Sequence, residues 1–195
     1  MTSPIVLWDI MGTLVHDPFF EEMPRFFGMS FDSLLEAKHP DAWVEFELGE
    51  LSQDEFLAGF FADGREFDRC DFIEAVASSY RWIPGMKELL RELRETGCTM
   101  HAFSNYPVWY RFIEERLELS RFIDWTFVSC LTGLRKPNPG AYAHVLDALA
   151  VPPDRCLFID DRTKNCEAAR EQGIASIVFE GAQPLRSSMQ QIGLL

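Results

Sequence analysis

Residues 4–14 read PIVLWDIMGTL, a short apolar run that ends at Asp9 and leads into a turn containing Gly12. Such a run is typical of a buried parallel strand, because helices cover both faces of that strand and leave little room for polar side chains. An acidic residue at the strand end, followed by a glycine that allows close approach of a ligand, is typical of a binding site. This stretch therefore predicts an α/β fold with Asp9 at its site.

The rest of the chain repeats this pattern. Further apolar runs occur at residues 98–103, 125–129, 156–159 and 174–179. Helical patterns lie at residues 85–96, 107–118, 140–149 and 164–172, while the tail after Gly181 is polar and only weakly helical. The alternation predicts a doubly wound parallel sheet, a Rossmann-like core, with its binding crevice at the carboxyl ends of the strands.

Residues 17–81 break this alternation. They show helical spacing, many phenylalanines and no convincing strand. A chain of 195 residues has room for one core and a modest insertion. We therefore expect an α/β core formed by residues 1–16 and 82–195, and a helical cap formed by residues 17–81.

The net charge of −13, from 18 basic and 31 acidic residues, argues against nucleic acid as a partner. An acidic protein that handles an anionic substrate needs local positive charge, which a bound cation and one or two lysines would supply. The sequence leaves the oligomeric state open.

The five cysteines are scattered and form no Cys-x-x-Cys pair, which favours a reducing, cytoplasmic setting over a disulfide framework or a zinc site. No apolar run approaches the ~18 residues of a membrane span. The first strand begins close to Met1, so we expect neither a leader peptide nor a membrane partner.

Polar residues follow four of the predicted strands. They are Asp9 after the first strand, Ser104 and Asn105 after the second, Lys136 beyond the third, and Asp160, Asp161 and Asn165 after the fourth. All four positions fall where a doubly wound sheet has its active site. Two adjacent acids at a strand end repel each other unless a cation holds them.

These residue types suit phosphoryl transfer. A carboxylate such as Asp9 can attack phosphorus and form an aspartyl-phosphate. The approach of two anions requires a divalent cation held by hard oxygens, so Asp9 and Asp161 predict a Mg²⁺ site. The Ser104 hydroxyl and the backbone or side-chain amide of Asn105 can donate hydrogen bonds to the phosphoryl oxygens, and Lys136 can neutralise charge that develops there.

The four positions, in this order and spacing over the whole chain, resemble the four motifs of the haloacid-dehalogenase-like (HAD-like) superfamily. The resemblance implies that Asp9 is the nucleophile, Ser104 the phosphate binder and Lys136 the charge clamp. It also implies a magnesium site formed by Asp9, the backbone carbonyl of Met11 and Asp161. Asp160 and Asn165 would support the cation through water or hydrogen bonds. Members with a small cap carry a helical insertion between the first two motifs, where residues 17–81 fall.

A narrower resemblance runs through the cap. The segments DPFF, FFGMS, AKHP, WVEFELG, DGREFD and SNYPVWY resemble plant chloroplast flavin mononucleotide phosphatases. The resemblance implies flavin mononucleotide or a similar small phosphorylated metabolite as substrate. The many cap phenylalanines are expected to form the cap's own core, and some could stack on a planar ring.

Met11 departs from the superfamily pattern, which has a second aspartate there as acid and base. Methionine cannot transfer a proton, and such help is worth ~10²–10⁴-fold in rate. Three candidates could replace that acid, His16, Asp17 and His101, and His16 is the best placed in sequence. Two alternatives to a phosphatase follow from Met11. They are a phosphonate hydrolase that uses Lys38, the single cap lysine, as a Schiff base, and a non-catalytic protein that binds phosphoryl ligands.

Overall fold

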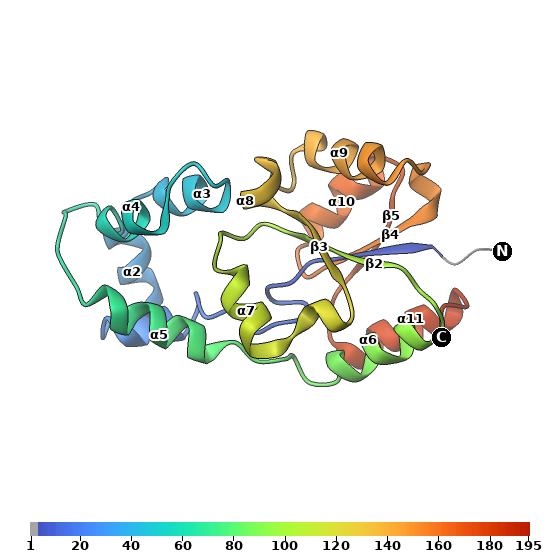
Figure 1. The fold of residues 1–195 in the computed structure, drawn as a ribbon, viewed down its shortest axis with the longest axis horizontal. Coiled ribbons are helices and arrows are strands. Elements are labelled where there is room, and N and C mark those ends of the chain that lie inside the picture. The colour runs from blue at the N-terminus through green and yellow to red at the C-terminus, as the bar shows by residue number, and fades with distance from the viewer. Residues whose placement is uncertain (1–3) are drawn as a thin grey trace.

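The computed structural model describes residues 4–195, which fold around one five-stranded sheet (Figure 1). The strands are β1 (Ile5–Trp8), β2 (Met100–Ser104), β3 (Asp124–Val128), β4 (Cys156–Asp160) and β5 (Ala175–Val178). All neighbours are parallel and the order is β3-β2-β1-β4-β5, so β1 is central. The predicted doubly wound sheet is confirmed, and each predicted strand ends within two residues of the observed one.

The side chains of β1 alternate between two apolar cores, one on each face of the sheet. Leu7 faces the core covered by α9 (Pro139–Leu149) and α10 (Thr163–Glu171). Val6 and Trp8 face the larger core, which is covered by α6 (Met86–Glu95), α7 (Tyr110–Leu117) and α11 (Ala182–Gln191). Figure 1 shows α9 and α10 on one side of the sheet and α6 and α11 on the other.

The C-terminal tail is more ordered than its polar sequence indicates. It forms α11, which buries Leu185 and Met189 against α6. Arg186 of α11 also forms a forked ion pair with Glu92 of α6, with N···O distances of 2.7 and 2.8 Å. Two apolar residues four positions apart are enough to anchor a helix whose other faces are polar.

Five helices fill the segment between β1 and the rest of the core. They are α1 (Glu22–Phe26), α2 (Phe31–Ala37), α3 (Ala42–Glu47), α4 (Gln53–Ala58) and α5 (Arg69–Ser79). The chain enters and leaves this segment side by side, since Val15 pairs with Trp82 and the His16 amide donates to the Arg81 carbonyl at 3.0 Å. The exact division at residues 16/17 and 81/82 stays a prediction.

Phenylalanine rings make up most of the interior of the cap. Phe27 packs against Phe60, Phe61, Phe67 and Phe72 with ring centroids 4.9–5.3 Å apart. Aromatic packing continues into the core, because the rings of Phe46 on α3 and Trp109, at the start of α7, have centroids 5.3 Å apart. The remaining short elements are α8 (Ser129–Thr132), η1 (Leu119–Arg121) and η2 (Pro153–Arg155).

Within residues 4–195, no helix has both the length and the apolar character needed to cross a bilayer. The five cysteines are all free thiols. A cytoplasmic location stays a prediction.

Candidate active site

The ends of β1 and β4 and the loop before α9 meet at the ammonium group of Lys136. Its Nζ donates to Asp9 Oδ1 at 2.7 Å, to Asp160 Oδ2 at 2.7 Å and to the Phe103 carbonyl at 2.6 Å. The Lys136 side chain is 1% exposed, and these three contacts use all three donors of an ammonium group. Lys136 is therefore a fixed, buried charge and not a surface lysine.

The protonation of these groups reflects burial and mutual charge. The pKa of Asp9 is raised to about 7, because burial and the carboxylates of Asp160 and Asp161, which raise it, outweigh Lys136, which lowers it. For Lys136, burial favours the neutral amine, but Asp9 and Asp160 outweigh it and raise the pKa of the amine. Lys136 is thus an ammonium at neutral pH, and additional positive charge beside Asp9 would favour its ionised, nucleophilic form.

The Asn105 side chain has a structural contact that the sequence does not indicate. Asn105 Nδ2 donates to the Lys136 carbonyl, and the Lys136 amide donates to Asn105 Oδ1, both at 2.8 Å. The Asn105 amide group therefore holds the Lys136 loop in place, and because its Nδ2 has a second N–H and Asn105 lines the cavity, its contact with a phosphoryl group stays a prediction. The Ser104 hydroxyl is buried and has no hydrogen-bond partner among residues 4–195, so it stays a candidate donor.

Asp160 has every acceptor position occupied. Besides Lys136, it accepts from Asn165 Nδ2 at 2.9 and 3.0 Å and from the Arg162 amide at 2.8 Å. Asp160 is fully buried, so these bonds offset the cost of removing its charge from water. In this geometry Asn165 orients Asp160 and Asp160 orients Lys136, while the predicted support of a cation by Asp160 and Asn165 stays a prediction.

Asp161 is exposed and lies against the glycine of the first loop. Gly12 has a φ of +78°, and a Cβ atom on it would lie 2.6 Å from Asp161 Oδ2. Only glycine meets both requirements, a left-handed backbone and this close approach. Gly12 therefore lets the Asp161 carboxylate stand beside the loop that carries Asp9.

These carboxylates can hold a divalent cation. Oxygen atoms of Asp9, Asp160 and Asp161 lie within 4.8 Å of one another. Asp160 is occupied by its partners, whereas within residues 4–195 the Asp9 side chain accepts only from Lys136 at 2.7 Å and from Thr13 at 3.3 Å, and Asp161 is exposed, so Asp9 and Asp161 can offer the hard oxygens that Mg²⁺ prefers. The residues present therefore fit magnesium, and the positive charge of the ion would allow the Asp9 carboxylate and a phosphate to approach each other.

Magnesium is expected to raise the thermal unfolding midpoint by several degrees. An ion that binds only the folded state adds about 2.7 kcal/mol at a hundredfold excess over Kd. Differential scanning fluorimetry with and without magnesium measures this shift. Asp161→Asn should abolish it, while Asp124→Asn, at an exposed residue at the start of β3, should keep it. An unchanged shift in Asp161→Asn would contradict the assignment of this ligand.

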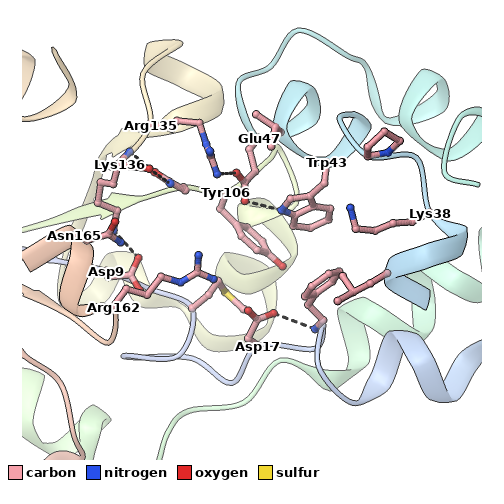
Figure 2. A pocket seen from close by; sticks show the side chains of 16 residues that line it. Asp9, Asp17, Lys38, Trp43, Glu47, Tyr106, Arg135, Lys136, Arg162 and Asn165 are labelled. Carbon is pink, nitrogen blue, oxygen red and sulfur yellow. Dashed lines mark hydrogen bonds and ion pairs between the residues drawn. The ribbon is translucent and has the colours of Figure 1, made fainter. Parts of the chain in front are cut away.

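A cavity of about 280 Å³ opens above Asp9, between the core and the cap (Figure 2). The cap lines it with Phe19, Leu35, Lys38, Pro40, Trp43, Val44 and Glu47. The core side adds Asp9, Met11, Asn105, Tyr106, Arg135, Lys136, Arg162 and Asn165. Asp17, the first residue of the predicted cap, also lines the cavity. Arg135 Nη2 joins the two sides through an ion pair with Glu47 Oε2 at 2.8 Å.

Sequence reasoning missed several of these lining residues, including Arg135, Arg162 and Glu47. Arg162 directly follows the paired acids, and Glu47 is an acid on an otherwise apolar face of α3. Both features were visible in the sequence. The pairing of Glu47 with Arg135, 88 positions away, was not.

Among the candidates to replace the missing acid, the structure corrects the preference for His16. His16 Nε2 lies 2.8 Å from Glu22 Oε2, and His16 does not line the cavity. His101 is also excluded, since its Nδ1 lies 2.8 Å from Thr126 Oγ1 on β3, away from the cavity. Asp17 does line the cavity, together with Met11.

A parallel sheet with these motifs at its strand ends and a helical cap above them defines a class of hydrolase. The sequence profile of the haloacid dehalogenase-like hydrolases matches residues 4–173. The chain belongs to this family, and the predicted membership is confirmed.

The relatives agree with this assignment. Flavin mononucleotide hydrolase 1 from Arabidopsis thaliana, named as chloroplastic, is 45% identical over 191 residues, which are 98% of this chain and 78% of that protein. A sesquiterpene phosphatase from Aspergillus oryzae is 27% identical over 70% of this chain and 71% of its own length. The predicted resemblance to the plant flavin mononucleotide phosphatases is therefore confirmed.

Solved structures share the fold. A HAD family enzyme from Bacteroides thetaiotaomicron, in complex with magnesium and inorganic phosphate, superposes with a TM-score of 0.75 at 19% identity, covering 92% of this chain and 96% of that one. The L-2-haloacid dehalogenase from Xanthobacter autotrophicus gives a TM-score of 0.66 at 15% identity, covering 100% and 85%. At these identities the likeness establishes the fold alone.

Proposed function

We propose that this hydrolase cleaves a phosphate monoester with magnesium, through a phosphorylated Asp9, and that its substrate is flavin mononucleotide or a similar small phosphorylated metabolite. The observation that carries the proposal is the buried Lys136 ammonium, 2.7 Å from Asp9 at a cavity wall. A carboxylate beside a fixed cation, with Asp161 as a second hard-oxygen donor, suits attack on phosphorus.

The reaction takes two displacements. The Asp9 carboxylate attacks phosphorus, the ester P–O bond breaks, and the phosphoryl group passes to Asp9. Lys136 offsets negative charge on the phosphoryl oxygens, and the unpartnered Ser104 hydroxyl is available to donate to one of them. Water then attacks the phosphorus, which releases inorganic phosphate and restores the Asp9 carboxylate.

The cavity supports a substrate with a planar ring. Phe19, Trp43 and Tyr106 line it, and the Phe19 and Trp43 rings lie 6.0 Å apart with an interplanar angle of 25°. Aromatic walls favour an aromatic leaving group through ring contacts. The name of the Arabidopsis relative, flavin mononucleotide hydrolase, also favours this substrate.

Flavin mononucleotide is expected to be hydrolysed with a kcat/KM at least about tenfold above that of glucose 6-phosphate, equivalent to about 1.4 kcal/mol of ring contact. Phosphate release with magnesium present measures both rates. Equal values for the two substrates would contradict the assignment of flavin mononucleotide while leaving phosphatase activity in place.

The position of Lys38 allows the phosphonate alternative to be tested. Lys38 lines the cavity from the cap, and its Nζ donates to the His39 carbonyl at 3.4 Å. Lys38 is expected to donate one hydrogen bond to the substrate. Lys38→Met removes that bond and should therefore lower kcat/KM for flavin mononucleotide by ~5-fold. Steady-state kinetics measure this. If the chain instead cleaves a phosphonate that carries an aldehyde, and Lys38→Met abolishes that cleavage while the magnesium-dependent thermal shift stays intact, a Schiff-base role for Lys38 is favoured.

A further inference from the structure

The proposed ester hydrolysis needs a proton for the departing oxygen, because an alkoxide is a poor leaving group. Met11 cannot supply that proton. The ionisable side chains that line the cavity are the candidates, and they are Asp9, Asp17, Lys38, Glu47, Tyr106, Arg135, Lys136 and Arg162.

Several candidates are already committed to other contacts. Asp9 is the nucleophile, and Lys136 uses its three donors on Asp9, Asp160 and Phe103. Glu47 accepts from Trp43 Nε1 at 2.6 Å as well as from Arg135. The two arginines do not release a proton in proteins. This leaves a tyrosine, a lysine and an aspartate.

The tyrosine and the lysine are poorly suited. The Tyr106 hydroxyl pairs with the Tyr80 hydroxyl at 2.7 Å. Burial raises the pKa of Tyr106 well above its ordinary value, so Tyr106 does not serve as a base near neutral pH. Lys38 comes from the cap, and Figure 2 shows it across the cavity from Asp9. Asp17 remains.

Asp17 stands six residues after Met11 on the loop that leads from the core into the cap. Its Oδ1 accepts from the Phe19 amide at 3.0 Å, and within the described part of the chain this is its one hydrogen bond. The side chain is partly exposed and lines the cavity near Arg162, as Figure 2 shows. Burial raises the pKa of Asp17, against the Phe19 amide and the Arg162 charge, which lower it.

We propose that Asp17 is the catalytic acid and base that replaces the aspartate missing at position 11, an inference that rests on the proposed ester hydrolysis. In the first step Asp17 gives its proton to the leaving oxygen as the ester P–O bond breaks, which yields an alcohol and phosphorylated Asp9. In the second step the Asp17 carboxylate takes a proton from the attacking water as the Asp9–phosphate bond breaks. Inorganic phosphate leaves, and both aspartates return to their starting forms.

Leaving-group dependence tests this role. In single-turnover experiments, Asp17→Asn should slow the release of riboflavin from flavin mononucleotide by ~10²–10⁴-fold, the usual worth of acid catalysis. It should slow the release of p-nitrophenolate from p-nitrophenyl phosphate by less than about tenfold, because nitrophenolate leaves without a proton. Asparagine keeps the oxygen that accepts from Phe19, and thermal melting with magnesium checks the fold. The neighbouring His16→Gln serves as the matched control and should keep both rates.

Each outcome is decisive. A large loss on flavin mononucleotide with a small loss on p-nitrophenyl phosphate supports Asp17 as the acid. Equal losses on both substrates, or no loss on either, overturn it, since the residue would then be structural or idle. If the unmodified protein hydrolyses neither substrate, the proposed phosphatase function itself fails, which is a separate result from a failure of Asp17.

Discussion

Asp9→Asn is expected to reduce phosphate release from flavin mononucleotide by at least about 10⁴-fold, since removal of a catalytic nucleophile costs effects of this size. The amide of asparagine does not form a stable bond to phosphorus. The substitution also removes a buried negative charge 2.7 Å from Lys136, but Asp160 still pairs with that ammonium at 2.7 Å. The fold should therefore survive the change, and a continuous phosphate-release assay measures the rate.

The control for this prediction is Asp124→Asn, which changes an exposed aspartate on β3 in the same way and should keep full activity. The result also separates an enzyme from a protein that only binds phosphoryl ligands. If the unmodified chain has no rate for Asp9→Asn to remove, while phosphate and magnesium still bind, the non-catalytic alternative is correct.

Lys136→Met should abolish turnover and also destabilise the fold, by about 3–5 kcal/mol. Lys136 is the shared partner of two buried carboxylates, and without it Asp9 and Asp160 face each other with no compensating charge. The Phe103 carbonyl also loses its donor. Urea unfolding followed by circular dichroism measures the loss of stability.

Lys87→Met provides the comparison for this measurement. Lys87 lies exposed on α6, and substitutions at such positions usually change stability by less than about 0.5 kcal/mol. If Lys136→Met unfolds at the same urea concentration as Lys87→Met, the buried charge cluster does not stabilise the fold as described. Loss of activity alone would then point to a purely catalytic role for this lysine.

The fold could be predicted from the sequence because each of its main elements carries a local pattern. The apolar run before Asp9 and the alternation of helices and runs determine the sheet, and the strand ends determine where Asp9 and Asp161 lie. The C-terminal tail lacks such a clear local pattern, so the sequence did not predict helix α11. Helix α11 buries only two residues, Leu185 and Met189, and their partner surface on α6 lies far away in the sequence.

The contacts within the site could not be predicted, because they depend on three-dimensional distances. A lysine before a proline reads as a loop residue, yet Lys136 is buried between acids 127 and 24 positions away. Asn105 reads as a ligand donor, and the sequence gives no sign that its side chain also holds the Lys136 backbone. Whether His16 or Asp17 can replace the missing acid depends on where their side chains point. His16 pairs with Glu22 and does not line the cavity, whereas Asp17 does.

The departure at Met11 changes how the reaction is divided among residues. In the proposed mechanism, attack on phosphorus depends on Asp9, Lys136 and Asp161, which the sheet and its loops bring together. Proton transfer in that mechanism is assigned to Asp17, which lines the cavity from the segment leading into the cap. A change in cap position would therefore affect protonation of the leaving group more than the nucleophile itself.

The measurement that tests the central claim most directly is mass spectrometry of the Asp9 peptide after acid quenching during turnover of flavin mononucleotide with magnesium. The account predicts a phosphoryl group on Asp9, and a beryllium fluoride adduct at the same carboxylate in the absence of substrate. Turnover with an unmodified Asp9 peptide at every quench time, and full activity in Asp9→Asn, would contradict it.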